Sequence, residues 1–470
     1  MMETTGLTSA AVAKTLSDEE LARAIARAVA DRGGSTYYVG GYVRDQILGR
    51  PSKDVDIEVH GIPVADLEGL LADFGELSAI GASFGVYNLK GHALDICVPR
   101  REDVARGGKG ELAEAADPFI GIYRAALRRD LTMNALYQDV LTGEVIDHFG
   151  GQTDLAAGVI RHVDDETFAQ DPLRVLRVAQ FAARFGMTVA PETIALCARL
   201  DLAGLPSERV LEELRKALTK AECPSVFFES LWAMEQLDPW FAEVKALKGL
   251  PQNPEWHPEG DVWTHTMLVV DAAASLRSQA HEPFAFVLSA LCHDFGKAVT
   301  TQEVNGRIIS HGHDKAGVPL AKALLDRLGA SAKVHSYVLN MVELHMAPNA
   351  FVGQQAHRKA YNRLFDRAVC PNDLLLLALS DDLGCDDRIA RPGVHEELVS
   401  HLQDFEELMA RPYVQGRDLL ELGMEPGPEL GEVLRYAHKL RLAGLSKEDQ
   451  LRQCEGYLRS LRRAQEKKTS

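Results

Sequence analysis

The spacing of hydrophobic residues changes once along this chain, near residue 150. Before that point, short apolar runs alternate with polar residues at the period of two that is typical of β-strands, as in 55–59 and 93–98. Helical segments are mixed with these runs. Beyond Gly151, apolar residues recur three and four positions apart, which is the spacing of one face of an α-helix. The pattern therefore predicts an α+β head followed by an almost wholly helical remainder.

Composition marks one further boundary. Residues 251–260 are rich in Pro, Asn and His and are the best candidate for a linker. We therefore predict a head over 1–150, a helical neck and body over 151–250, a second helical domain over 255–400 and a basic helical tail over 401–470.

The strand over 55–59 carries the first candidate chemistry. Asp54 and Asp56 are two residues apart, so at strand period they share one face, while Val55, Ile57 and Val59 share the other. Paired carboxylates of this kind can hold Mg²⁺. A pair of acids alone is more often a solvated strand face, and the pair needs a second feature to indicate a site.

That second feature is a glycine turn upstream. Gly40 and Gly41 directly follow the apolar run 37–39, and glycines there let backbone N–H groups approach a triphosphate closely. A lone glycine pair is more often only a turn. Together with the carboxylates, and with Asp95 on the second alternating run as a third acid, it favours nucleotidyl transfer.

Three segments carry a family resemblance: 40–58 with the glycine turn and the paired acids, 128–136 with the sequence RRDLTMNAL, and 171–177 with the sequence DPLRVLR. In content, order and spacing they resemble the class II tRNA nucleotidyltransferases and bacterial poly(A) polymerases of the polymerase-β-like superfamily. The resemblance extends over about 35–250. It implies a polymerase-β-like head, two-metal transfer with Mg²⁺ on Asp54 and Asp56, and ATP and CTP as substrates.

The resemblance also implies roles for single residues. Gly41 and Arg44 would face the triphosphate, Asp95 would be the third catalytic acid, and Arg129 would touch the sugar or the phosphates. The alternative for Arg129 is a structural ion pair with the neighbouring Asp130.

A helix is predicted from Asp171 to Gly186, with Asp171 and the following proline at its start. Arg174 and Arg177 follow at three-residue spacing and lie on one face with Asp171. An aspartate can accept from an exocyclic amine while an arginine donates to a ring nitrogen, and cytosine and adenine both offer that pair. These side chains would select C and A without a template, as the family does. The alternative for Asp171 is helix capping.

Two positions depart from the family pattern. Gln170 stands before Asp171 where the family usually has a glutamate, and Gln180 stands where an arginine often follows the two helix arginines. The first would remove an orienting partner and the second a phosphate contact.

Histidines gather in the second helical domain, where nine of 16 lie between 257 and 357, among them His311, His313 and His345. The order His265, His293-Asp294 and Asp381 on successive predicted helices resembles the HD phosphohydrolase superfamily, which implies a divalent metal such as Ni²⁺ or Mn²⁺ that activates water. Lys297 either steadies a substrate phosphate or is a residue at the C-terminal end of a helix.

Composition adds limits. The chain has 470 residues, 46% of them hydrophobic and 25% charged, and no apolar run approaches the ~18–20 residues needed to span a bilayer. The N-terminal residues show no secretory signal and the seven cysteines form no CxxC pair, so we expect reduced thiols and a cytoplasmic protein. Although the net charge is −17, residues 435–468 hold ten Lys/Arg and four Asp/Glu. Such a tail either contacts an RNA backbone or is a solvated helix.

The leading prediction is template-independent addition of CMP and AMP to build or repair CCA at the 3′ end of tRNA. The partners would be the tRNA 3′ end and acceptor arm, ATP and CTP, with no membrane and no DNA. The HD domain would add hydrolysis of 2′,3′-cyclic phosphates or 2′-phosphates. Alternatives are an enzyme that adds only A or only CC, a poly(A) polymerase, an RNA-binding regulator with an inactive head, and a phosphohydrolase whose main activity is in the HD domain.

Overall fold

The computed structural model describes residues 16–50, 54–77, 86–100, 116–385 and 393–469. The chain forms two compact units. The first consists of Met1–Glu213 and Val226–Gln236, and the second of Leu214–Ser225 and Leu237–Ser470. The predicted α+β class with a small sheet in the head and helices beyond it is confirmed. The predicted boundaries between the four domains stay predictions.

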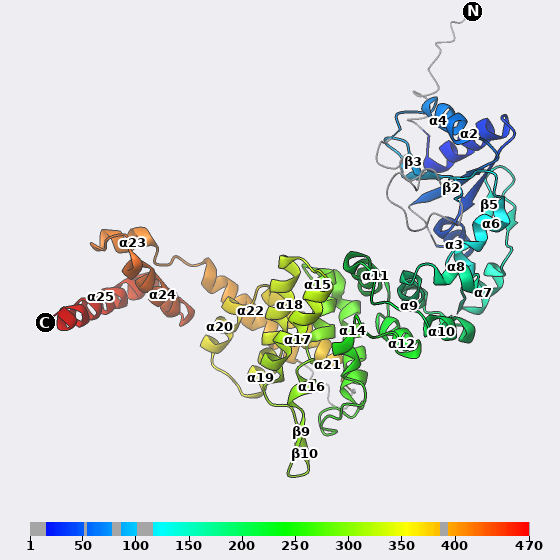
Figure 1. Cartoon of the computed structure of the whole chain (residues 1–470). Helices are drawn as coiled ribbons and strands as arrows, with labels where there is room; N and C mark the ends of the chain where they lie inside the picture. Colours follow the sequence, from blue (N-terminus) through cyan, green and yellow to red (C-terminus); the bar gives the residue numbers. More distant parts are fainter. Residues whose placement is uncertain (1–15, 51–53, 78–85, 101–115, 386–392, 470) are drawn as a thin grey trace, which may run out of the picture. The chain divides into compact units, whose positions relative to one another are not determined.

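A six-stranded sheet with the order β3-β4-β2-β1-β5-β6 forms the centre of the head (Figure 1). The strands β2 and β4 run parallel, and the other neighbouring pairs are antiparallel. The strand bounds are β1 (Ser35–Val39), β2 (Val55–His60), β3 (Val86–Asn88), β4 (Leu94–Cys97), β5 (Tyr137–Asp139) and β6 (Val145–Ile146).

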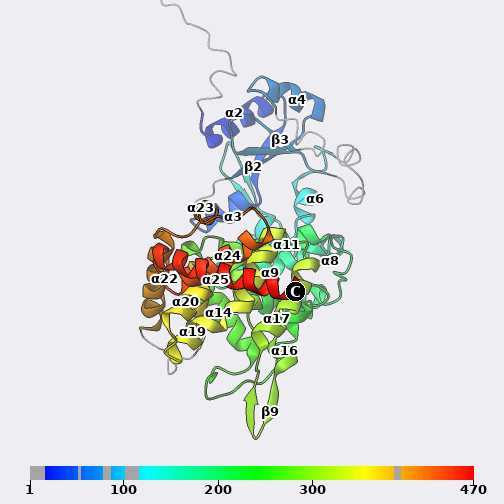
Figure 2. The same ribbon diagram turned by 90° about the vertical axis from the view of Figure 1, so that its left-hand side faces the viewer.

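Helix α2 (Asp18–Ala30) contacts β1, β2 and helix α4 (Val64–Ala72). The side chain of Ser17 accepts from the backbone N–H of Glu20, whose carboxylate accepts in return from the backbone N–H of Ser17, and this capping box fixes the start of α2. Leu21, Ile25 and Val29 form its buried stripe at helical spacing. Figure 2 shows α2 and α4 together beside the sheet.

The alternation along β2 differs in one respect from the prediction. Val55, Ile57 and Val59 are buried as expected, and Asp56 on the opposite face is partly exposed. Glu58 on the same face as Asp56 is also buried, with a relative exposure of 5%. The polar face of this strand is therefore covered beyond Asp56.

The remainder of the first unit is helical, with one small parallel pair of strands. Helix α9 has the predicted start and end: Pro172 precedes its first residue, and Gly186 ends it at φ 66°. The elements are α3 (Gly41–Ile47), α6 (Ile122–Leu127), the 3₁₀ helix η3 (Thr132–Asn134), α7 (Gly151–Ala157), β7 (Val159–Ile160), α8 (Asp165–Ala169), α9 (Leu173–Phe185), β8 (Thr188–Val189), α10 (Pro191–Cys197), α11 (Ser207–Lys220), which continues into the second unit, and α12 (Ser225–Ala233).

The second unit is a helical assembly in which α14, α15, α18 and α21 contact one another. A hairpin, β9 (Gln302–Val304) and β10 (Arg307–Ile309), extends from these helices, as Figure 2 shows. The helices are α13 (Ala242–Lys245), α14 (Val262–Leu276), η4 (Arg277–Gln279), α15 (Pro283–Cys292), α16 (Lys297–Thr300), α17 (His313–Arg327), α18 (Ala332–Leu344), α19 (Met346–Gly353), α20 (Arg358–Arg367), α21 (Pro371–Leu383), α22 (Val394–Ala410), α23 (Gly416–Glu421), α24 (Pro428–Leu442) and α25 (Lys447–Thr469).

Two further observations bear on the predictions. Residues 251–260, all of which the structure describes, contain no helix or strand and lie within the second compact unit, and their role as a linker stays a prediction. Across the described ranges, no helix has the length and apolar character that a membrane span requires.

Candidate active sites

The carboxylates of the head meet on the sheet. Asp54 immediately precedes β2, and the parallel register of β2 and β4 places Asp56 opposite Asp95. Burial raises the pKa of Asp56, and the nearby carboxylates of Asp95 and Asp54 raise it further against the opposing effect of Arg129. Carboxylates that repel one another in this way are relieved by a divalent cation, so these residues fit Mg²⁺.

The glycine turn lies beside two guanidinium groups. Gly40 ends β1 with φ +62°, a conformation that favours glycine, and Gly41 begins α3. A Cβ atom built on Gly40 would lie 3.6 Å from Nη1 of Arg129, and one built on Gly41 would lie 3.4 Å from Nη2 of Arg44. Two positive groups beside the backbone of a glycine turn suit an anion such as a triphosphate.

Both arginines are held by other side chains. The buried Arg44 forms an ion pair of 2.8 Å with Asp45 and donates from Nη1 to Oδ1 of Asn134 at 2.7 Å. Arg129 forms an ion pair of 3.1 Å with Glu58. The alternative partner that we considered for Arg129, Asp130, pairs instead with Arg177. Glu58 was not a candidate in the sequence, although its even spacing from Asp56 marks the shared strand face.

Glu58 is the centre of a buried network. Its Oε1 accepts from the hydroxyl of Tyr137 at 2.8 Å and contacts Nε2 of His60 at 2.9 Å, while its Oε2 pairs with Arg129. Although burial opposes it, the hydrogen bond from His60 and the charge of Arg129 lower the pKa of Glu58. The network fixes Arg129 next to the glycine turn.

The three predicted base-selecting residues on or beside α9 have protein partners. Oδ1 of Asp171 accepts from the backbone N–H of Leu173 at 3.1 Å, as the capping alternative expects, and its carboxylate also pairs with Arg209 at 2.8 Å. Arg174 donates to the main-chain oxygens of Arg128, at 2.7 Å, and of Thr167.

The two departures from the family pattern lie around the same helix. Gln180 on α9 is 1% exposed, and its Nε2 has no hydrogen-bond partner within the described residues. Gln180 is therefore part of the packed interior of this unit and carries no charge that could take the place of an arginine. Gln170 follows α8 at its C-terminal end.

The pair of Arg177 and Asp130 connects α9 to the RRD segment at 2.7 Å. Although burial opposes it, Arg177 and a hydrogen bond from Asn134 lower the pKa of the buried Asp130.

We expect Asp130→Ala to lower the free energy of unfolding by about 1–3 kcal/mol, because Asn134, Arg177 and a backbone N–H lose their acceptor. Urea denaturation followed by circular dichroism measures this.

The control for that prediction is Asp165→Ala, because Asp165 has 70% of its side chain exposed and has the imidazole of His162 as its ion-pair partner. It should change stability by less than about 0.5 kcal/mol. Equal stability of the Asp130 and Asp165 variants would show that the buried pair contributes nothing.

In the second unit, the four predicted HD residues lie together. His265 lies on α14, His293 and Asp294 directly follow α15, and Asp381 lies on α21. Nε2 of His265 lies 3.0 Å from Oδ1 of Asp381, and Nε2 of His293 lies 3.3 Å from Oδ2 of Asp294 and 3.7 Å from Oδ1 of Asp381.

Two further histidines complete this cluster. Nε2 of His313, at the start of α17, lies 3.3 Å from Oδ1 of Asp294 and 3.3 Å from Nε2 of His345, which lies between α18 and α19. Both histidines follow the HD pair in the sequence, but the sequence alone does not distinguish them from the other histidines nearby. His311, two residues before His313, is exposed. We call His265, His293, Asp294, His313, His345 and Asp381 the HD cluster.

Hydrogen bonding assigns the ring nitrogens of three of these histidines. Nδ1 of His293 lies 2.7 Å from the main-chain oxygen of Ala290, and Nδ1 of His313 and Nδ1 of His345 each lie 2.8 Å from a main-chain oxygen. A carbonyl oxygen only accepts, so each Nδ1 carries the proton and each Nε2 presents a lone pair. Nε2 of His293 and Oδ1 of Asp294 are buried without a hydrogen-bond donor in the described part of the chain. Lone pairs and carboxylate oxygens that converge in this way fit divalent cations.

The pKa values of Asp294 and His345 suit residues that bind a metal. Although burial opposes it, the charge of Lys297 holds the pKa of Asp294 well below its usual range. Burial lowers the pKa of His345 to about 4, so this imidazole is neutral at neutral pH. Nζ of Lys297 lies 2.7 Å from Oδ2 of Asp294, and Lys297 is the first residue of α16. The alternative that placed Lys297 at a helix C-terminus is therefore wrong.

Comparisons with known proteins find relatives of both regions of the chain. A family model described as the poly(A) polymerase head domain matches residues 36–161, and a model of the HD domain matches residues 262–379. A multifunctional CCA protein from Cupriavidus metallidurans is 36% identical over 87% of this chain and 97% of its own length. A multifunctional CCA protein from Halorhodospira halophila is 35% identical over 88% of this chain and 97% of its own length.

Solved structures share the fold. A CCA-adding enzyme in complex with ATP superposes with a TM-score of 0.63 at 21% identity and covers 94% of both chains. The Thermotoga maritima CCA-adding enzyme complexed with tRNA gives a TM-score of 0.61 at 20% identity, over 93% of this chain and 95% of that one.

Proposed function

Because the chain belongs to the family of multifunctional CCA proteins, we propose that it adds CMP and AMP, without a template, to the 3′ end of tRNA. The observation that carries this proposal is similarity over nearly the whole length of those relatives, together with three carboxylates beside a glycine turn that two arginines flank. The partners are the tRNA acceptor end, ATP and CTP. A cytoplasmic location is part of the proposal.

The head residues divide the reaction among themselves. Asp54, Asp56 and Asp95 would hold Mg²⁺, which would supply Lewis-acid stabilisation of the transferring phosphoryl group. The backbone of Gly40 and Gly41 would receive the triphosphate. Arg44 and Arg129, fixed by Asp45 and Glu58, would neutralise its charge from either side of the turn.

Transfer then depends on position. The oxygen of the 3′-hydroxyl of the tRNA attacks the α-phosphorus of the nucleotide and gives its proton to water. The bond from the α-phosphorus to the oxygen that bridges to the β-phosphate breaks, and pyrophosphate leaves with the negative charge that the arginines face. Prepositioned charges of this kind need no reorganisation at the moment of reaction. The single-nucleotide assay described at the end of the Discussion tests this function.

The chemistry at α9 would choose the base. In the structure Asp171 and Arg174 hold protein partners, so a bound nucleotide would compete with Arg209 for Asp171 and with main-chain oxygens for Arg174. Arg177 is held by Asp130 and would support the pair rather than exchange partners. Asp171 and Arg174 would therefore be the pair that reads the Watson–Crick edge of C or A.

We expect Arg174→Ala to weaken the use of both CTP and ATP and to narrow their advantage over UTP and GTP. Each lost base hydrogen bond is worth about 1–3 kcal/mol. Asp171→Asn should reduce selectivity too, since the amide still caps α9 but has lost the charge. The measurement is kcat/KM for each of the four nucleotides.

Arg184→Ala is the matched control, since it removes the same charge from the last turn of the same helix. It should leave the ranking of nucleotides unchanged. If the Arg174 variant also keeps the parent's ranking at normal stability, Asp171 and Arg174 serve only to hold α9 in place.

A second activity is favoured by the HD cluster. His265, His293 and Asp381 form one three-ligand group, and Asp294, His313 and His345 form a second, with ligand atoms within 4.8 Å of one another in each group. We propose that the cluster binds divalent ions such as Ni²⁺ or Mn²⁺, with the carboxylate of Asp294 between the two groups. Bound there, such ions would lower the pKa of water for attack on a phosphoester. The substrates would be 2′,3′-cyclic phosphates or 2′-phosphates at damaged RNA ends.

A further inference from the structure

The four histidines of the HD cluster do not orient their rings in the same way. His293, His313 and His345 direct Nδ1 to a main-chain oxygen three residues earlier in the chain. Nδ1 of His265 instead lies 2.9 Å from Oε1 of Glu259. The fourth ring is therefore oriented by a side chain, and that side chain comes from the segment between α13 and α14.

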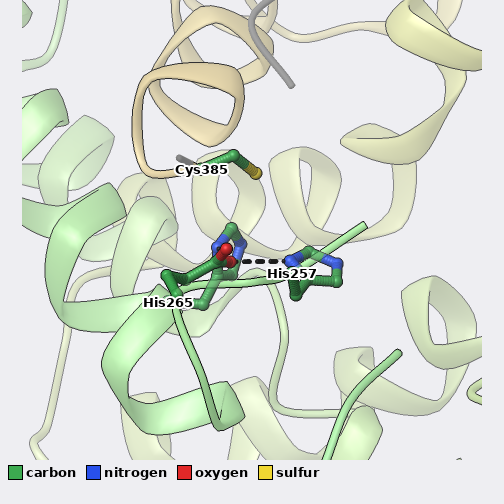
Figure 3. A group of neighbouring side chains, drawn as sticks. His257, His265 and Cys385 are labelled. Carbon is green, nitrogen blue, oxygen red and sulfur yellow. Dashed lines mark hydrogen bonds and ion pairs between the residues drawn. The ribbon is translucent and has the colours of Figure 1, made fainter. Parts of the chain in front are cut away.

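Glu259 is buried next to His265. Its side chain is 6% exposed, and its Oε1 also lies 2.8 Å from Nδ1 of His257. Its Oε2 is buried and has no hydrogen-bond partner within the described residues. Figure 3 shows His257 and Cys385 beside His265 in this part of the second unit. A buried carboxylate is costly unless its partners need its charge, and here one oxygen serves two imidazoles.

We propose that Glu259 is a positioning residue of the HD site. Its Oε1 lies 2.9 Å from Nδ1 of His265, and by accepting the proton of this nitrogen it would fix the tautomer in which Nε2 presents its lone pair to the side of Asp381 and His293. A carboxylate on the far nitrogen also makes an imidazole a stronger metal ligand than a carbonyl oxygen does. This inference rests on the proposed metal-binding function of the HD cluster.

None of the three other groups around His265 accepts a proton from its Nδ1 in this arrangement. Oδ1 of Asp381 lies at Nε2, on the side of the ring that faces the cluster. The thiol of Cys385 has a partner in the main-chain oxygen of Asp381, 3.5 Å from its Sγ. His257 meets His265 edge to face, with ring centroids 4.7 Å apart, and shares the same oxygen of Glu259. The ligand atoms of His257, Glu259, His265 and Cys385 also lie within 4.8 Å of one another. His257→Ala therefore separates two roles of Glu259: it leaves the metal affinity unchanged if Glu259 only positions His265, and lowers it if these residues bind an ion directly.

The test is calorimetric titration of the metal-free full chain with Ni²⁺ and, separately, Mn²⁺. Glu259→Ala should bind metal on the order of 10- to 100-fold more weakly than the parent, as expected when a carboxylate behind a histidine ligand is lost. Glu259→Gln should fall between the two, because its amide oxygen still accepts from Nδ1 but carries no charge. His257→Ala should keep the parent's affinity within a few-fold.

A second readout separates positioning from support of the fold. The visible absorption spectrum of the Co²⁺-loaded protein should change in Glu259→Ala and return toward that of the parent in Glu259→Gln. In both variants, the melting temperature of the metal-free protein should stay near that of the parent. The rate of CCA addition should also stay near the parent's rate. Parent-like metal affinity in a folded Glu259→Ala overturns the inference. If that variant does not fold, parent-like affinity in Glu259→Gln overturns it instead.

Failure of the inference is distinct from failure of the proposed hydrolase. A parent protein that binds no divalent ion contradicts the metal function of the whole cluster. A parent that binds ions, with Glu259 variants that bind them equally well, contradicts the role of Glu259 alone.

Discussion

Asp56→Ala is expected to abolish the incorporation of CMP and AMP while the protein stays folded. Asp56 lies opposite Asp95 on the parallel pair β2 and β4, two residues after Asp54. It therefore belongs to the group of carboxylates that would hold both Mg²⁺ ions. A metal ligand contributes several kcal/mol to the transition state, which corresponds to a loss on the order of a thousandfold in rate. Asp54→Ala should have the same effect.

Stability should respond differently. The pKa of Asp56 is raised by burial and by the carboxylates around it, so the charged side chain is unfavourable in the folded head when no cation is present. Its removal relieves repulsion and should not lower the melting temperature in the absence of metal. The assay is incorporation of labelled CMP on tRNA that ends at the discriminator base.

Asp73→Asn is the control for this pair of variants, because Asp73 is an exposed acid at the end of α4 in the same unit. It should retain the parent's rate. Near-normal incorporation by either Asp54→Ala or Asp56→Ala would contradict the assignment of the head.

His293→Ala should eliminate hydrolysis of a 2′,3′-cyclic phosphate or a 2′-phosphate and leave CCA addition within a few-fold of normal. His293 contacts Asp294 and Asp381 at the centre of the HD cluster and belongs to the second compact unit, whereas the head carboxylates belong to the first. Different residues on different units would carry the two reactions. Both activities should be assayed with Mg²⁺, Mn²⁺ and Ni²⁺ in turn.

His311→Ala is the matched control for His293, since it removes an exposed histidine two residues from His313 without changing the cluster. It should keep both activities. A parent that hydrolyses none of these substrates with any metal would leave the cluster without the proposed reaction. A folded His293 variant that also loses CCA addition would contradict the division into two sites.

The local sequence pattern was sufficient to predict features that lie within a single strand or helix. The alternation of Val55, Ile57 and Val59 predicted the strand and its carboxylate face, and Asp171-Pro172 with Gly186 predicted the limits of α9. The same strand carries another acid at even spacing, Glu58. The sequence did not indicate a role for Glu58, because the polar face of a strand is expected to be solvated, whereas Glu58 is buried.

Residues that act through tertiary contacts could not be predicted in the same way. His313 and His345 are two histidines among nine in that stretch, and only the packing of α15, α17 and α18 brings them to Asp294. Glu259 lies in a segment whose composition is typical of a linker. Its contact with Nδ1 of His265 is tertiary, and composition carries no information about that contact.

The measurement that tests the central claim most directly uses three labelled tRNAs, ending at the discriminator base, at C and at CC, with each nucleotide supplied singly to the purified chain. The account predicts that CTP extends the first two, that ATP extends the third by one residue, and that UTP and GTP extend none. Repeated AMP addition to all three tRNAs, or extension that stops at CC even when ATP is supplied, would contradict it.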